Sequence, residues 1–364
     1  MSGLSVGRPA RVLVLVAALS AIVGAARAHV IGDEAHDRPT AQYASAAGWL
    51  QSLKSQMLAL AMPIAPTRPR PSAAALDTPP AAAAMEAAFA PFAPTVRTRS
   101  DGQYFYVESH GMPDHPMMIG ITAWQQQVPI AHDYVGANAW RIPLVPKPAA
   151  NPLSARSHFF RGAIALAVNG VPIFNPIKQD GRTDTFLAGE LDEFGGHAGR
   201  ADDYHYHIAP VFLQKTLGPA APLAFALDGY PILGYREPDG SAALGLDAFN
   251  GHMGPDGAYH YHATPAYPYV NGGFHGEVVE LEGQVDPQPV ARGVRPATNP
   301  LRGAAIVGFT ARGAEGYSLT YRLRGEDYIV NYRVEPTRAA RFEFVDPRGK
   351  VRVEEYPSGS RPRR

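Results

Sequence analysis

The sequence contains two stretches that carry the same residues in the same order, 55 residues apart. Each stretch has an Asp, a Gly-His-x-Gly turn and a Tyr-His-Tyr-His segment at the same spacing, one at 192–207 and the other at 247–262. A further matching element precedes each, at 169–174 and at 228–233. Agreement at so many positions is not coincidence. The sequence therefore predicts two related half-units, at about 163–210 and 223–265, packed around a pseudo-twofold axis.

Short apolar runs, interrupted every few residues by Gly and Pro, fill the region 96–290. This pattern is typical of a mainly β domain with long irregular loops. Ser100-Asp101-Gly102, between two alternating runs, predicts a hairpin. Only two copies of the repeat are present, and solenoids need more, so an internally duplicated β-rich domain is expected. Residues 296–357 predict a small antiparallel β module with three strands and a further pair.

The N-terminal 28 residues have the pattern of an export signal. Arg8 and Arg11 precede an apolar run at 12–24, and small residues at 26 and 28 mark a cleavage point after Ala28. The run is shorter than the ~20 residues that span a bilayer. Residues 29–95 predict a short amphipathic helix at 41–61 and then a Pro/Ala-rich linker. We expect a periplasmic or secreted protein with no membrane span after signal removal.

Composition excludes several classes of function. The 364 residues hold 33 Lys and Arg against 33 Asp and Glu, and this balance argues against nucleic acid as a partner. The chain has no cysteine, which excludes disulfides, thiolate metal sites and Cys nucleophiles. It has 13 His, and six of them lie in the duplicated stretches. The missing cysteine together with the clustered His therefore points to nitrogen and oxygen donors for any metal site.

The Tyr-His-Tyr-His segments have the spacing of metal ligands. Side chains alternate along a strand, so His205 and His207 share one face, with Cα atoms about 6.6–7 Å apart. Two imidazoles at that separation can converge on one ion at ~2.0–2.1 Å. His197, in the Gly-flanked turn, is the expected third ligand. The second copy offers the equivalent triple, His252, His260 and His262.

Other polar residues accompany the triples. Asp192 and Asp247 lie five residues before the first His of each triple, and Asp228 opens the second copy. These carboxylates suit the orientation of an imidazole N–H, direct ligation, or the capping of a turn. His115, in a Gly-Met-Pro-Asp-His loop, is predicted to take part in the metal site.

The donor set narrows the metal and leaves the function open. Imidazole and carboxylate without sulfur suit copper or zinc best, as two mononuclear sites or one dinuclear site. A three-His zinc with an open position would favour a hydrolase, and a coupled copper pair an oxidase. The leading hypothesis is an exported metal-binding protein. The alternative is a non-catalytic extracellular binding or adhesion module in which the His clusters are structural.

The duplicated motif resembles the YHYH family. The resemblance runs from about residue 96 to 290 and rests on specific motifs. These are the loop ending at His115, Asn138-Ala139-Trp140, Asn169-Gly170-Val171-Pro172, Asp228-Gly229-Tyr230-Pro231, the two Tyr-His-Tyr-His segments and Tyr267-Pro268-Tyr269. The resemblance implies export and brings no established activity.

Overall fold

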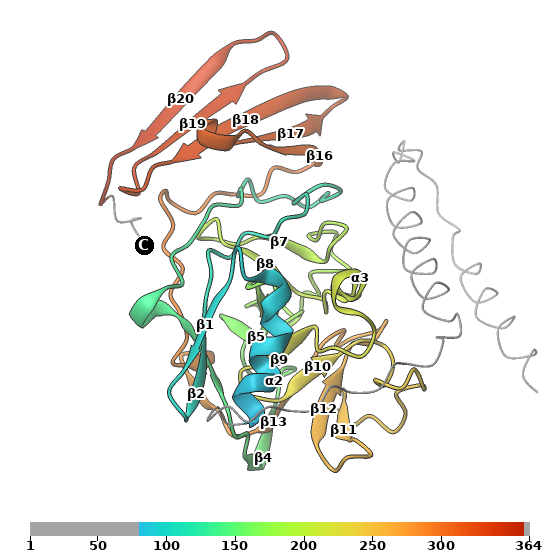
Figure 1. Ribbon diagram of the computed structural model, residues 1–364. Coiled ribbons are helices and arrows are strands. Elements are labelled where there is room, and N and C mark those ends of the chain that lie inside the picture. Colours follow the sequence, from blue (N-terminus) through green and yellow to red (C-terminus); the bar gives the residue numbers. More distant parts are fainter. Residues whose placement is uncertain (1–79, 360–364) are drawn as a thin grey trace, which may run out of the picture. The chain divides into compact units, whose positions relative to one another are not determined.

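The computed structural model describes residues 80–359 (Figure 1). The fold is mainly β, as the sequence predicts, with 36% strand and 9% helix. The predicted export signal at 1–28 and the predicted helix at 41–61 lie outside the described residues.

An eight-stranded sheet occupies the centre of the region that holds the His motifs. Its strand order is β11-β12-β10-β9-β5-β6-β8-β7. Read outward from the central antiparallel pair β5 and β9, the two halves have the same order, and β6/β8 and β10/β12 are its parallel pairs. The strands are β5 (Ala163–Ala167), β6 (Pro172–Phe174), β7 (Gly196–Ala198), β8 (Tyr204–Tyr206), β9 (Ala224–Ala226), β10 (Pro231–Leu233), β11 (Gly251–Met253) and β12 (Tyr259–His262). Each predicted half-unit contains four of them.

The two central strands are built from small and branched apolar residues. Every residue of β5 and β9 is buried, so this pair is the middle of the core. The turns that leave them contain Gly170 and Gly229, with φ of 80° and 100°. A Cβ at Gly229 would lie 2.6 Å from the carbonyl oxygen of Pro143, so glycine is required there for both conformation and space.

Smaller sheets surround this core. The predicted hairpin is formed by β1 (Arg97–Ser100) and β2 (Tyr104–Glu108), with β3 (Trp140–Pro143) added to it. Asp101 closes the turn by accepting hydrogen bonds from the backbone N–H groups of Gln103 and Tyr104. The remaining elements are η2 (Gly136–Asn138), β4 (Pro148–Ser154) paired with β13 (Gly273–Gly276), η3 (Val211–Leu213), α3 (Gln214–Leu217), and β14 (Val279–Leu281) paired with β15 (Gln284–Asp286).

Part of the predicted linker is structured. Helix α2 (Pro80–Phe89) and the short η1 (Ala90–Phe92) replace the irregular chain expected up to residue 95. Met85 and Phe89 are buried, and the Phe89 ring lies 5.7 Å from Phe105 and 5.8 Å from Phe225 between centroids. The prediction from composition is wrong here, because these apolar residues recur at helical spacing. The Ala-rich segment therefore forms a helix with an apolar face that packs on the core.

The C-terminal module is a five-stranded antiparallel sheet, which confirms the prediction for this part of the chain. Consecutive strands pair in the order β16-β17-β18-β19-β20. Leu319 and Phe342 are its least exposed residues, and Ala304, Ile306 and Val330 are buried with them. The elements are β16 (Ala304–Ala311), η4 (Gly313–Glu315), β17 (Tyr317–Leu323), β18 (Glu326–Val334), β19 (Ala340–Val345) and β20 (Val351–Tyr356).

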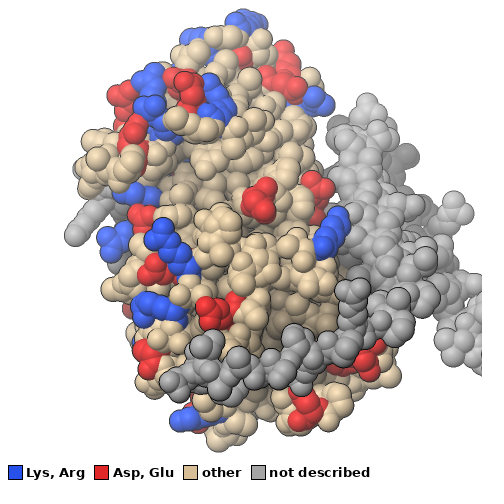
Figure 2. All heavy atoms as spheres, in the orientation of Figure 1, with Lys and Arg blue, Asp and Glu red and all other residues tan. Residues whose placement is uncertain are grey.

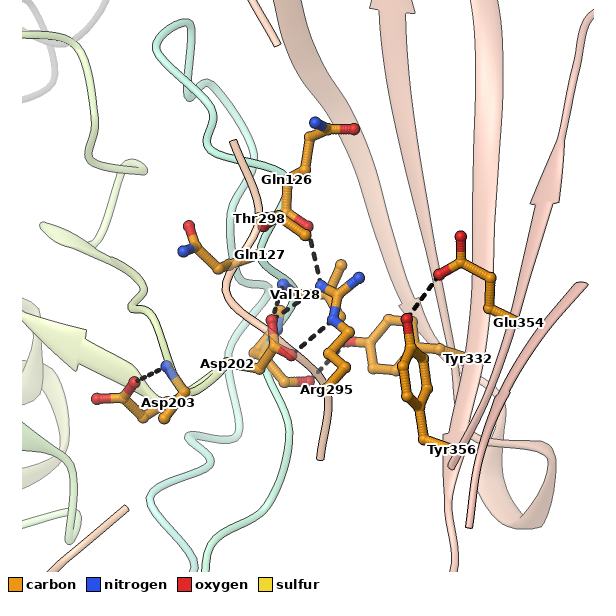
Figure 3. A network of polar contacts seen from close by, with 12 residues as sticks. Gln126, Gln127, Val128, Asp202, Asp203, Arg295, Thr298, Tyr332, Glu354 and Tyr356 are labelled. Carbon is orange, nitrogen blue, oxygen red and sulfur yellow. Dashed lines mark hydrogen bonds and ion pairs between the residues drawn. The ribbon is translucent and has the colours of Figure 1, made fainter. Parts of the chain in front are cut away.

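A buried ion pair lies where this module meets the His-bearing region (Figure 3). Arg295 donates to both carboxylate oxygens of Asp202, at 2.8 and 2.9 Å, and both side chains are 3% exposed. The Arg295 guanidinium also stacks on Phe342 at 4.3 Å, and the Tyr332 hydroxyl donates to the Pro129 carbonyl at 2.7 Å. These contacts hold β18 and β19 of the module against Arg295, which is paired with the loop before β8, and against the segment at Pro129.

Charged side chains of both signs are interspersed on the face shown in Figure 2. Across residues 80–359, the structure contains no helix long and apolar enough to cross a membrane.

Candidate metal centres

The first centre is built by the antiparallel pair β7 and β8. His197 and His205 are directly opposite each other in the register, and His207 follows two residues later on the same face. The Nε2 atom of His207 lies 3.1 Å from that of His205 and 3.1 Å from that of His197. The alternation predicted for the Tyr-His-Tyr-His segment therefore brings all three imidazoles together.

The opposite nitrogen of each ring is held by the backbone. His205 Nδ1 lies 2.9 Å from the Asp203 carbonyl and His207 Nδ1 lies 2.7 Å from the Asn175 carbonyl. His197 has a backbone hydrogen bond with Glu190. A carbonyl oxygen only accepts, so Nδ1 carries the hydrogen and a neutral ring presents a bare lone pair at Nε2. Three lone pairs thus face one another.

Protonation of His197 or His207 does not remove the repulsion between these lone pairs. Burial, and then the neighbouring imidazoles, lower the pKa of His197 well below its usual value. Burial and the adjacent His205 do the same to the pKa of His207. A divalent ion fits the donor set instead. With metal–nitrogen distances of about 2.0–2.1 Å, two imidazole nitrogens on one ion lie roughly 2.9–3.4 Å apart.

The second centre repeats the first in β11 and β12. His252 and His260 are opposite in the register, and His260 Nε2 lies 3.1 Å from His252 Nε2 and 3.0 Å from His262 Nε2. Backbone carbonyls again face the other nitrogens, with His252 Nδ1 2.9 Å from Leu244 and His262 Nδ1 2.8 Å from Gly234. Burial lowers the pKa of His262.

Glu237 completes the second centre, and the sequence interpretation missed it. One carboxylate oxygen, Oε1, lies 2.8 Å from His252 Nε2 and 3.2 Å from His262 Nε2, and Oε2 lies 3.2 Å from His260 Nε2. The four side chains form one group whose ligand atoms all lie within 4.8 Å. A signal was available, because Glu237 follows Asp228 by nine residues and Lys178 follows Asn169 by the same interval. If the alignment of the two copies is extended past residues 174 and 233, Lys178 and Glu237 fall at the same position.

The two centres are separate. Their ligands form two distinct groups. Four strands lie between β8 and β12 in the sheet order, and Figure 1 shows β7 and β8 well apart from β11 and β12. Of the arrangements left open by the sequence, the structure fits two mononuclear sites rather than one dinuclear site.

The aspartates expected to orient imidazoles have other roles. Asp192 and Asp247 each cap the turn before the first His, accepting backbone N–H groups on Oδ1. Their Oδ2 atoms accept the hydroxyls of Tyr204 and Tyr259, both at 2.7 Å. They therefore lie with the tyrosines, on the face of the strand opposite to the imidazoles. Turn capping, one of the alternatives given above, is the observed role.

Asp228 also belongs to the tyrosine face. Its Oδ2 accepts the Tyr261 hydroxyl at 2.5 Å and the Gly276 N–H at 2.9 Å, so the expected contact with an imidazole is replaced by one with tyrosine. Burial raises the pKa of Asp228 to about 6. The carboxylate beside an imidazole is instead Asp203, whose Oδ2 lies 3.4 Å from His205 Nδ1. It has no acidic counterpart in the second copy.

His115 is not a metal ligand in this arrangement, contrary to the prediction. Its Nδ1 lies 2.7 Å from the Pro116 carbonyl, and its Nε2 lies 2.8 Å from the Tyr206 hydroxyl. Its ring stacks on Phe194 with centroids 3.9 Å apart. Tyr206 points to the opposite face from the first His triple, so His115 supports the tyrosine side of the strand. Burial lowers the pKa of His115 to about 4.

Comparison with known proteins agrees with the motifs. Residues 139–243 match the family model described as YHYH protein, which confirms the resemblance over this segment. The match includes the first centre and ends before the histidines of the second. No curated protein and no solved structure is significantly similar to the chain.

Proposed function

We propose that this chain is an exported metal-binding protein with two mononuclear transition-metal sites. One site uses His197, His205 and His207, and the other uses Glu237, His252, His260 and His262. The observation that carries the proposal is the convergence of three Nε2 lone pairs at 3.0–3.1 Å in each centre. Lone pairs aimed at one another in a buried site are stabilised by a cation between them.

Copper or zinc is the proposed metal. Imidazole and carboxylate donors suit both ions. Five of the six rings are oriented by a hydrogen bond with the backbone, as metal-ligating histidines commonly are. A bound ion would supply Lewis-acid chemistry, or redox chemistry in the case of copper. Hydrolase and oxidase activities are both consistent with the donor set.

Export is the second part of the proposal. It rests on the N-terminal signal pattern and the absence of cysteine in the sequence. Metal would be acquired after translocation. N-terminal sequencing of protein from its native compartment should begin at His29, the residue after the expected cleavage point. A chain that retains the first 28 residues would contradict this part of the proposal.

Metal titration tests the first part. The untagged full-length protein, stripped of metal, should take up two equivalents of Zn(II) in competition with a chromophoric chelator. His205→Ala should remove one equivalent, and Glu237→Ala combined with His260→Ala, which leaves two imidazoles in the second centre, should remove the other. His110→Ala is the matched control, because this side chain is 59% exposed and lies outside both groups.

Two results would contradict the metal proposal. The wild-type protein could fold and take up no metal, or the His205→Ala/Glu237→Ala/His260→Ala protein could still bind two equivalents. The first result would favour the alternative of a non-catalytic binding module with structural His clusters.

A further inference from the structure

The two centres differ at one aligned position. Glu237 reaches the imidazoles of the second centre, whereas the corresponding residue beside the first centre is Lys178. The Lys178 ammonium is 2.6 Å from Oε1 of Glu190. The first centre therefore has three donors, and the second has four. Three protein ligands leave a position for an exogenous ligand, whereas four close a tetrahedral site.

The first centre also lines a cavity of about 180 Å³. The three imidazoles share its wall with Lys178, Glu190 and Arg200. Glu190 is 93% buried, since its relative exposure is 7%, and its Oε2 has no hydrogen-bond partner within the described part of the chain. A buried carboxylate oxygen needs a donor, and a ligand hydroxyl in this cavity would provide one.

Charge favours an anion at this cavity. Three neutral imidazoles leave the full charge of a divalent ion, the buried Asp203 carboxylate beside His205 offsets one positive charge, and the Lys178–Glu190 pair is neutral in sum. Arg200 adds a positive charge to the wall. In the second centre Glu237 already supplies a negative ligand. The same metal would therefore attract an external anion more strongly in the first centre than in the second.

We propose, on the basis of the metal-binding function above, that the first centre is the ligand-accessible site and binds a small oxyanion that carries a hydroxyl. The anionic oxygens face the ion and Lys178, and the hydroxyl donates to Glu190 Oε2. The second centre is closed by Glu237 and holds its ion as part of the structure. Lys178 is then the residue that determines which centre is open.

The test uses full-length protein loaded with Co(II), whose visible spectrum reports its ligands. The double variant Glu237→Ala/His252→Ala isolates the first centre, because it leaves only two imidazoles in the second, and His197→Ala isolates the second centre. His197 and His252 are only partly buried, which favours folding of the variants. Hydrogencarbonate should change the spectrum of the Glu237→Ala/His252→Ala protein and leave that of the His197→Ala protein unchanged. Nitrate, a planar monoanion without a hydroxyl, should bind the first centre about tenfold more weakly.

Charge exchange at the aligned position sharpens the test. In the Glu237→Ala/His252→Ala protein, Lys178→Glu should weaken hydrogencarbonate binding at least about tenfold, and Lys215→Glu, at an exposed lysine, should not. In the His197→Ala protein, Glu237→Gln should make the second centre respond to the anion.

Equal responses of the two centres, or no response with Co(II) bound at both, would overturn this inference and leave metal binding intact. Failure of both single-centre proteins to bind Co(II) would instead overturn the metal proposal on which it rests.

Discussion

Two glycines hold the same position against the two His-x-His pairs. A Cβ at Gly199 would lie 2.7 Å from Cε1 of His205, and one at Gly254 would lie 2.8 Å from Cε1 of His260. That carbon is bonded to the Nε2 atom that faces the other imidazoles. The second Gly of each Gly-His-x-Gly turn is thus required by contact with a ligand ring, and not only by the sharp turn that the sequence suggests.

Gly254→Ala should therefore weaken metal binding at the second centre. The added methyl group displaces the His260 ring, and misplacement of one ligand typically costs 10–100-fold in affinity. Competition titration with Zn(II) would measure this, and the first centre of the same variant is the internal control. Unchanged affinity at the second centre would show that the ring accommodates the methyl group.

His115 gives the metal-free protein a pH-dependent stability. Burial holds its folded-state pKa at about 4, whereas an unfolded His has a pKa of about 6.5. The folded state then binds fewer protons than the unfolded state between these values. The contribution of His115 to stability is therefore fully present above about pH 6.5 and is lost as the pH falls towards 4.

His115→Gln should reduce this dependence. Urea unfolding of the metal-free proteins at pH 7 and pH 4.5 should show that the wild-type free energy of unfolding falls by on the order of 2 kcal/mol more than that of the variant. Comparison with the variant is necessary because buried Asp192 and Asp228, whose pKa values burial raises to about 6, act in the opposite direction. Equal slopes in the two proteins would contradict the assignment.

At the scale of elements, local sequence patterns predicted the strands, whereas contacts between segments distant in the chain were not predicted. The alternation in Tyr-His-Tyr-His placed His205 and His207 on one face, and the alternating runs after residue 296 gave all five strands of the C-terminal sheet. The pairing of His115 with Tyr206 depends on the path of a loop 91 residues away in the chain, which no local pattern encodes. The approach of Glu237 to His260 is also a contact between distant segments, but alignment of the two copies points to the position of Glu237.

Helix α2 shows where composition misled. Its Ala-rich composition does not predict which residues are buried, yet Met85 and Phe89 are only 4% and 1% exposed. Phe89→Ala should lower the free energy of unfolding by about 3–5 kcal/mol, because a buried aromatic side chain is lost from between Phe105 and Phe225. Glu86→Ala, on the exposed side of the same helix, should change it by less than about 0.5 kcal/mol. Equal effects in a urea titration would mean that the helix does not pack on the core.

At the scale of the whole molecule, the two halves of the eight-stranded sheet have the same strand order when read outward from β5 and β9. Each half contributes two parallel-paired strands and one histidine triple, and the turns and backbone anchors of the triples correspond. The two halves differ chemically at one aligned position, which is Lys178 in the first and Glu237 in the second. Two similar scaffolds would then serve one accessible and one closed metal site.

The central claim is that each triple holds its own metal ion. Anomalous scattering from crystals of untagged protein, isolated from its native compartment without added metal, measures this most directly. The account predicts two strong peaks per chain above the metal absorption edge, one among His197, His205 and His207 and one among Glu237, His252, His260 and His262. Both peaks should vanish below the edge of the same element. Well-ordered imidazoles with no anomalous peak at either position, in protein from a metal-replete culture, would contradict it.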